Sequence, residues 1–223
     1  MSDLVEIDSV ASTIIYEVMR APKAFLYLAA MAVDADGSPR CYGPGDSGLD
    51  YNANGGTPGA NWWGGPTTAD GYPIEQKVYD PYPGMWVSGT AHFDPAYQED
   101  SPYRYLDSER IPFFVLPANH NNGAQLGDVG VCLNTVSGDN CYAVYGDVGP
   151  SDQIGEGSMR LANALGLDPD PKSGGTSEGI IAYLIFPASI GKWQPPSNWF
   201  SKANDIFQSW GGLNLLEKLL TNI

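Results

Sequence analysis

The chain has 223 residues and a mass of 23.9 kDa, a size that suits one domain better than two. Hydrophobic residues make up 43% of it, which is enough for a packed core and excludes wholesale disorder. Eleven basic residues stand against 26 acidic ones, so the net charge is −15. A protein that binds phosphates or an anionic membrane needs the opposite sign. The charge therefore argues against nucleic acid and membrane as partners and favours a polycation.

The chain opens with an acidic, polar stretch that has none of the features of a secretory signal. The apolar run at 24–33 is too short to span a bilayer and predicts a buried strand instead. We expect either an extracellular protein whose leader is absent from this chain or a cytoplasmic one.

The first predicted element is a helix over 4–18, because apolar residues recur there at three- and four-residue steps before Pro22. The strand at 24–33 follows, and residues 36–72 are dominated by turn dipeptides. Apolar runs separated by turn residues predict six further strands, at 76–80, 85–92, 111–116, 126–134, 141–147 and 180–186. Two more helical segments are expected, one beyond Gly157 and one from about 200, the latter broken at Gly211–Gly212.

This pattern predicts an α+β fold that is mainly β, organised as a single domain over 1–223. We expect a compact β-barrel-like core with flanking helices at both termini, and take the six-stranded double-psi barrel as its analogy. The interpretation would be refuted by a parallel sheet covered with helices on both faces.

Three cysteines, Cys41, Cys132 and Cys141, cannot all pair within one chain. Cys132 and Cys141 flank a turn and either form a disulfide or stay as thiols; the residues leave both open. The two histidines, His92 and His120, lack the spacing of a structural zinc site.

The segment AVYGDVGPSDQIGEGS at 143–158 is the strongest candidate for chemistry. Asp147 ends an apolar strand, and Glu156 lies between two glycines, so that no neighbouring side chain crowds its carboxylate. Two carboxyl groups that converge on a cleft can cleave a glycosidic bond, one as acid and the other as base or nucleophile. The alternative is that Asp147 caps a turn and Glu156 is simply solvated.

The same segment resembles a known family. DVGPxxxIGEGS at 147–158 is similar to the signature of glycoside hydrolase family 75, the fungal-type chitosanases. Family-like segments also occur at 33–56, 61–64, 105–117 and 126–132, so that the resemblance covers about 33–187. The predicted amino-terminal helix and the tail beyond Pro187 lie outside it.

The resemblance implies an endo-acting hydrolase that cleaves chitosan, a β-1,4-linked glucosamine polymer, with inversion, and so takes part in polysaccharide degradation. The family's essential residues fall on Glu156, expected as general acid, and Asp147, expected as general base. No metal or other cofactor is implied, the substrate is chitosan or its oligosaccharides, and we expect a monomer.

An acidic chain suits this substrate, because glucosamine carries an ammonium group that carboxylates attract. The residues expected to bind substrate are acids and aromatic side chains that stack on sugar rings, namely Asp36, Asp50, Tyr51, Trp62, Trp63 and Asp128. For the tryptophans the alternative is that one or both anchor a loop on the core.

Two other functions remain open. The chain could be a different glycan hydrolase, such as a peptidoglycan muramidase, although its negative charge would repel that more anionic polymer. It could also be a carbohydrate-binding protein without activity, although both carboxyl residues and their glycines are present.

Overall fold

The structure is a computed structural model that describes residues 3–190 and 193–223. Within these ranges the strands are β1 Leu4–Val10, β2 Thr13–Val18, β3 Ala24–Asp34, β4 Gly56–Thr57, β5 Asn61–Trp62, β6 Phe113–Pro117, β7 Val129–Asn134, β8 Asn140–Gly149, β9 Glu156–Ser158 and β10 Thr176–Phe186. The α-helices there are α1 Met159–Ala164, α2 Pro196–Trp210 and α3 Gly212–Leu220.

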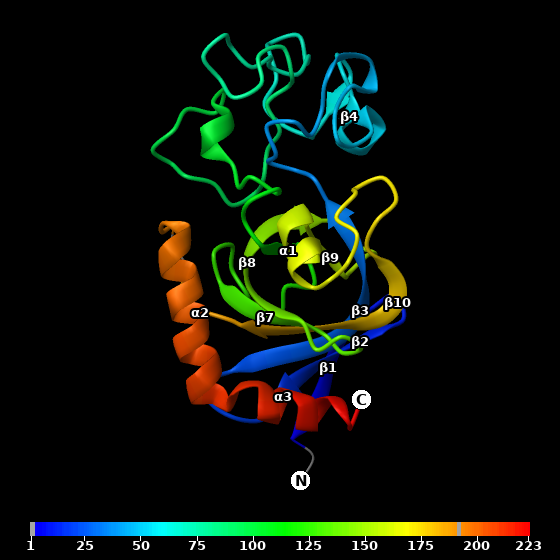
Figure 1. Ribbon diagram of the computed structural model, residues 1–223, viewed down its shortest axis with the longest axis vertical. Helices are drawn as coiled ribbons and strands as arrows, with labels where there is room; N and C mark the ends of the chain where they lie inside the picture. Colours follow the sequence, from blue (N-terminus) through cyan, green and yellow to red (C-terminus); the bar gives the residue numbers. More distant parts are fainter. Residues whose placement is uncertain (1–2, 191–192) are drawn as a thin grey trace.

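Six strands close into a barrel in the order β3, β10, β7, β8, β6, β9, with β9 pairing back onto β3 (Figure 1). The β3–β9 and β6–β8 pairs are parallel, and the other four are antiparallel. The predicted mainly β, α+β fold with a barrel core is therefore confirmed. The double-psi pattern of connections stays a prediction.

Strand β3 shows why its sequence is a continuous apolar run. Phe25 and Tyr27 point into the barrel interior, whereas Ala24 and Leu26 belong to a second core outside the barrel wall. A strand buried on both faces loses the usual alternation of apolar and polar residues. The buried strand predicted at 24–33 is confirmed.

The helix predicted over 4–18 is wrong: this segment is the antiparallel hairpin β1–β2, which extends the sheet from one end of β3. A register shift between Glu6 and Asp8 interrupts the alternation of β1 and leaves Ile7 exposed. The bulge and the turn together imitate a helical spacing of apolar residues. The segment is rich in β-branched residues, which pack better on a pleated surface than in a helix.

The helices predicted near the carboxyl end are confirmed. Helix α2 lies along one side of the barrel and α3 crosses beside β1 and β2 (Figure 1). Phe207, Trp210 and Leu216 pack with the outer side chains of β7 and β10. The chain breaks between the helices at Gly211, whose φ of 134° is accessible to glycine. No helix of the described chain is long and apolar enough to span a bilayer.

Residues 36–112 form a loop-rich lobe above the barrel (Figure 1). The strands predicted at 76–80 and 85–92 are wrong: in the described structure these residues form no strand, and Trp86 alone among them takes part in an isolated bridge, with Glu75. The amides of Val87, Gly89 and His92 donate to three different segments, at Ile74, Gly64 and Gly146. Because these successive amides bond to three different segments and not to one partner strand, no β-sheet hydrogen-bond ladder forms.

The three cysteines are thiols. Cys132 and Cys141 face each other in register across β7 and β8, but no disulfide joins them. Cys41 lies in the small core of the lobe with Ala35 and Tyr42.

Candidate active site

Asp147 and Glu156 lie at the same level of the barrel wall, on strands that flank β6. Val115 of β6 is in register with Asp147 of β8 on one side and with Glu156 of β9 on the other. Residues in register on neighbouring strands point to the same face of a sheet. The two carboxyl residues therefore share one face, with the buried Val115 side chain between them.

The position of Gly149 shows how closely the two side chains approach each other. A β-carbon on Gly149 would lie 3.2 Å from Oε2 of Glu156, so the Glu156 carboxylate leans over this glycine toward β8. Asp147 precedes Gly149 by two residues on the same strand, a separation of about 6.6 Å. These are backbone positions; the strands β8 and β9 flank β6 and so lie about 9.5 Å apart, and the lean of Glu156 brings the two carboxyl groups closer together than that.

Strand β3 brings two further acids to this face. Its last residue, Asp34, pairs with Ser158 of β9, and Ala32 pairs with Glu156. The backbone amide of Asp36 donates to Oδ1 of Asp34 over 2.6 Å. Ser88 donates to the Asp36 carboxylate over 3.2 Å, and the Tyr42 side chain also hydrogen-bonds to it. Four carboxyl groups from three strands and a loop thus meet at one place.

Burial and mutual repulsion hold protons on these groups. Burial raises the pKa of Asp147 to about 6, although two backbone hydrogen bonds oppose the shift. Burial raises the pKa of Glu156 to about 7, with the charges of Asp147 and Asp50 adding to it. Burial and then neighbouring carboxylates raise the pKa values of Asp34 and Asp36 well above the ordinary value. Such crowding is typical of sites that transfer protons.

Asp147 is held in place by the loop-rich lobe. Its Oδ1 accepts hydrogen bonds from the backbone amides of Ala91 at 2.9 Å and Val148 at 2.7 Å. The amide of His92 in turn donates to the carbonyl of Gly146 over 2.9 Å. The lobe therefore fixes the strand end on which this carboxylate lies.

A cavity of about 420 Å³ opens beside Glu156, where the lobe meets the barrel. Asp34, Asp36 and Asp50 line it together with Tyr42 and the loop 171–174. We call this the acidic cavity. It can hold a polar ligand of the size of one or two sugar rings, and it presents acidic side chains and one lysine, Lys172, to that ligand.

The predicted binding residues differ in where they lie. Asp50 lines the acidic cavity and is held by Asn54 and the amide of Tyr51. Tyr51 is exposed, and Nζ of Lys172 lies 4.8 Å from its ring centroid. The protein's own ammonium group thus covers one face of this ring, and Tyr51 is not among the residues that line the acidic cavity.

The two tryptophans have separate positions. Trp62 is half-buried and packs edge-on between Tyr42 and Trp86, as an anchor of the lobe. Trp63 is 64% exposed, and its indole N–H donates to the carbonyl of Asn54. Of the pair, Trp63 presents the free ring face.

Asp128 is not brought to the cavity. It is fully buried, and its carboxylate accepts hydrogen bonds from the amides of Gln125, Ala188 and Ile190. The predicted contact of Asp128 with substrate is therefore wrong, because its side chain ties together two loops at the end of β10. In sequence, an acid that holds loop amides and an acid that faces a cleft look alike.

Some cavity residues carried a signal in the sequence and others did not. Asp34 and Tyr42 lie inside the family-like segment 33–56, so their neighbourhood was marked. Gln153 and Lys172 also line the acidic cavity, but nothing in their local sequence indicated it. Within the described ranges, no cluster of three or more histidine, cysteine or acidic residues is arranged to hold a metal ion.

No protein-family model matches this chain, and no curated protein matches it either.

Proposed function

We propose that this chain is an endo-acting chitosanase that hydrolyses β-1,4-linked glucosamine polymers with inversion at the anomeric carbon. One observation carries the proposal: Asp147 and Glu156 flank Val115 on one face, on strands about 9.5 Å apart, and both have raised pKa values. Inverting glycosidases separate their two carboxyl groups by about 6.5–9.5 Å, which leaves room for a water molecule.

Glu156 is the general acid. Its higher pKa keeps a proton on the side chain when Asp147 is already ionised. As the bond from the anomeric carbon to the glycosidic oxygen breaks, Glu156 gives its proton to that oxygen, which leaves as a hydroxyl group.

Asp147 is the general base. It takes a proton from a water molecule, and the oxygen of that water bonds to the anomeric carbon from the face opposite the leaving group. The backbone donors from Ala91 and Val148 favour the ionised form of Asp147 that this step requires. A β-linked substrate then yields an α-configured product.

The acidic cavity supports glucosamine as the sugar bound there. Asp34, Asp36 and Asp50 lie within reach of a ligand in the cavity, and an ammonium group compensates their mutual repulsion. Tyr51 and Trp63 have exposed rings next to two lining residues, since Tyr51 follows Asp50 in the chain and Trp63 donates to the carbonyl of Asn54.

The test is incubation of the purified chain with fully deacetylated chitosan, chitin oligosaccharides and peptidoglycan. We expect new reducing ends from chitosan, with the α anomer appearing first in proton NMR. An initial β anomer would contradict the inverting assignment. Release of reducing ends from peptidoglycan alone would indicate a muramidase, and binding of chitosan without cleavage would indicate a carbohydrate-binding protein.

A further inference from the structure

A short segment of the lobe, residues 90–92, lies between Asp147 and the carboxyl-terminal helix α2. The amide of Ala91 donates to Oδ1 of Asp147 over 2.9 Å, and the next amide, that of His92, donates to the carbonyl of Gly146 over 2.9 Å. The backbone of this segment is therefore bonded to the end of β8, while the side chain of His92 contacts the segment that leads into α2.

The imidazole ring of His92 packs against two tryptophans, Trp193 just before α2 and Trp199 in its first turn. Its centroid lies 5.2 Å from the first ring and 5.5 Å from the second, and the two indoles meet edge-on at 5.2 Å. His92 is 6% exposed and Trp199 is fully buried. In Figure 1 this end of α2 lies nearest the lobe. In the part of the chain that the structure describes, no hydrogen-bond partner reaches Nε2 of His92, so ring packing holds this edge of the imidazole.

The two tryptophans are themselves held by the barrel. Trp199 packs in one core with Phe113 of β6 and Val144 of β8. The segment that leads from β10 to Trp193 begins with amides that donate to the Asp128 carboxylate, those of residues 188 and 190. The indoles thus form a fixed surface against which the His92 ring rests.

The segment that carries Ala91 has little freedom of its own. The hydroxyl of Thr90 donates to the carbonyl of His92 over 2.7 Å and accepts a hydrogen bond from the amide of Leu106 over 3.0 Å. These bonds close the segment on both sides of Ala91. A displacement of the His92 ring is therefore passed on to the Ala91 amide.

We propose that His92 is a positioning residue for Asp147: packed against Trp193 and Trp199, it keeps the Ala91 amide on the carboxylate that accepts the proton. This inference rests on the proposed function, in which Asp147 acts in its ionised form. It makes α2, which lies beyond the family-like stretch 33–187, part of the apparatus that supports the general base. A backbone N–H that bonds to a carboxylate favours its charged form, so loss of this bond raises the pKa of the carboxyl group.

His92 acts through packing and not through charge. Burial lowers its pKa to about 4, so the ring is neutral when the site is active. The charged and titratable groups that face Asp147 lie on other elements, namely Glu156 on β9, Asp34 on β3, Asp36 in the lobe and Tyr145 on β8. Replacing His92 by an uncharged residue leaves all four in place.

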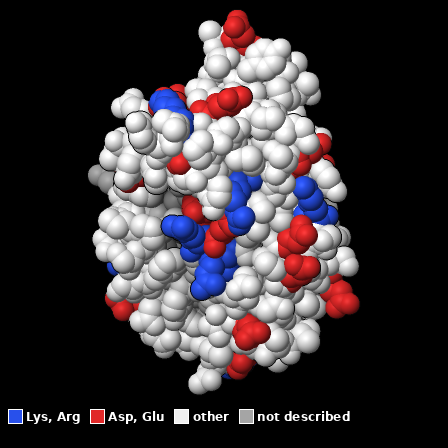
Figure 2. Space-filling view, turned by 45° about the horizontal axis from the view of Figure 1, so that its top comes forward, with Lys and Arg blue, Asp and Glu red and all other residues white. Residues whose placement is uncertain are grey.

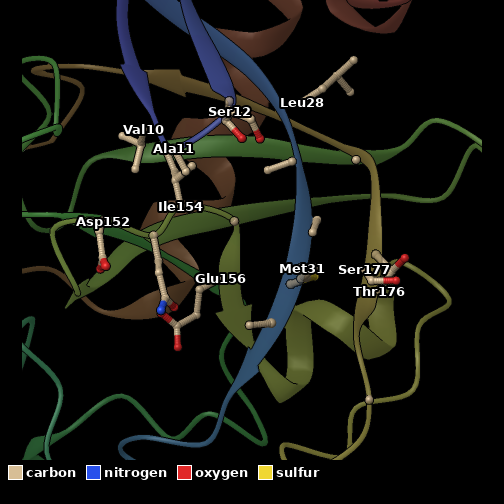
Figure 3. Close-up of a pocket in the computed structure, with 18 residues that line it drawn as sticks. Val10, Ala11, Ser12, Leu28, Met31, Asp152, Ile154, Glu156, Thr176 and Ser177 are labelled. Atoms are coloured by element: carbon tan, nitrogen blue, oxygen red, sulfur yellow. The ribbon is translucent and has the colours of Figure 1, made fainter.

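Glu156 serves as an internal reference because one whole side of it is formed by other elements. A groove of about 730 Å³ opens there, lined by the β1–β2 turn, β3, β10 and the loop before β9. In Figure 3, Glu156 lies between Met31 of β3 and the loop that carries Asp152 and Ile154. Within the described ranges no residue of the lobe or of α2 lines this groove. A change at His92 should therefore alter the ionisation of Asp147 before that of Glu156.

The experiment compares His92→Ala with His92→Phe in the full chain, with kcat/KM on chitosan oligosaccharide measured against pH. In His92→Ala we expect the lower limb of the profile to move up by about one pH unit, so that kcat/KM at pH 6 falls about fivefold while the upper limb stays. His92→Phe keeps a ring between the indoles and should restore the wild-type limb. Trp193→Ala, at a half-buried position, should reproduce the shift and replaces His92→Ala if that variant does not fold.

Trp210→Leu is the matched control. It removes a buried ring from the far end of the same helix, where Trp210 packs on Phe186. It should lower the melting temperature at least as far as His92→Ala does and leave the lower limb in place. A lower limb that stays in place in folded His92→Ala would overturn the inference, and so would an equal shift in Trp210→Leu.

An NMR titration of the Asp147 carboxyl carbon, in protein labelled with ¹³C-aspartate, follows the same ionisation without substrate. We expect it to shift upward in His92→Ala and to stay at the wild-type value in His92→Phe. If the chain cleaves no chitosan, the proposed function fails, and this titration still decides whether His92 positions the Ala91 amide. An Asp147 titration that is unchanged in His92→Ala refutes that positioning.

Discussion

Asp147 and Glu156 differ in what surrounds their carboxylates, and the difference suits two roles. Asp147 receives two backbone N–H donors, which stabilise negative charge. Within the described ranges no hydrogen-bond donor reaches the Glu156 carboxylate, which faces other acids instead. One residue is thereby prepared to accept a proton and the other to give one.

Replacing either residue by its amide should abolish most turnover. Neither Glu156→Gln nor Asp147→Asn can transfer a proton, and such assistance contributes about 10²–10⁴-fold in rate. We expect kcat on chitosan to fall by that factor while binding of oligosaccharide, followed by calorimetry, persists. Asp70→Asn removes an exposed acid outside the acidic cavity and serves as the matched control.

The assignment of Glu156 as general acid would be refuted by a Glu156→Gln variant that keeps more than about a tenth of wild-type kcat. A decrease in kcat of less than tenfold corresponds to an increase of under about 1.4 kcal/mol in the activation barrier. Azide should restore cleavage to Asp147→Gly, because it can attack in place of water. It should not restore Glu156→Gln, which lacks the acid.

The pH dependence of kcat/KM should be bell-shaped. Activity requires Asp147 ionised and Glu156 protonated, so it should rise as pH passes about 6 and fall as pH passes about 7. The two limbs are properties of the pair, because the carboxylates interact. The profile is measured at subsaturating chitosan oligosaccharide; activity that stays constant from pH 4 to pH 6 would contradict the role of Asp147.

At the scale of elements, strand β9 fixes the position of Glu156. It has three residues and is bonded to β3 on one side and β6 on the other. The glycines beside Glu156 serve this packing rather than clearing space around its carboxylate. Gly155 has φ 95°, and a β-carbon there would lie 2.4 Å from the carbonyl oxygen of Ala30.

Two alanine substitutions should separate strand packing from carboxylate position. Gly155→Ala is strained and clashes with backbone, so we expect a loss of about 2 kcal/mol in unfolding free energy together with lost activity. Gly149→Ala meets only Val115 and the Glu156 carboxylate, so activity should fall about tenfold with little change in stability. Chemical denaturation and kcat measured on both variants check this. Equal loss of stability in the two would contradict it.

The elements also show what could be predicted from the sequence. The continuous apolar run of β3 and the helical spacing beyond 200 depend on local burial, so their types were predictable. The β1–β2 hairpin was not, because a bulge at Glu6–Asp8 hides its alternation. The pairing of Asp147 and Glu156 with Val115 joins one short segment, 147–156, to a residue more than 30 positions earlier in the chain. Resemblance marked the two acids, but no local pattern showed their common neighbour.

At the scale of the whole molecule, the 26 acidic residues outnumber the 11 basic ones, but they do not form a continuous patch on every face. On the face shown in Figure 2, acidic side chains are scattered, and several basic ones gather near its centre. Surface pairs such as Arg40–Glu109 neutralise part of the charge. This face therefore offers a polycation no continuous acidic patch, and we expect the acidic cavity to bind it instead.

Activity on chitosan should consequently fall with salt, because mobile ions screen ammonium–carboxylate attraction. Asp36→Asn and Asp50→Asn should each raise KM and flatten the dependence of kcat/KM on salt, whereas Asp70→Asn should follow wild type. Reducing-end assays across a range of sodium chloride concentrations measure this. If the two cavity variants follow wild type at every concentration, the acidic cavity does not bind the substrate cation.

The same crowded acids should make the fold less stable at neutral pH. Their pKa values are higher in the folded state than in the unfolded one, so the folded state holds more protons and stability falls as pH rises. We expect the melting temperature to fall from about pH 5 to about pH 8, with a smaller fall in Asp34→Asn. A melting temperature that rises over this range in wild type would contradict the crowding.

The closure of the barrel by β9 also bears on how the protein acquires activity. Glu156 reaches Asp147 only after β9 has paired with both β3 and β6, segments that are far apart along the chain. Contacts of such long sequence separation form late, since loop closure must be completed first. A nascent or partly folded chain therefore has no carboxyl pair, and under the proposed function it would not hydrolyse a glycan. The proposed catalytic competence would then be acquired in the same step that closes the barrel.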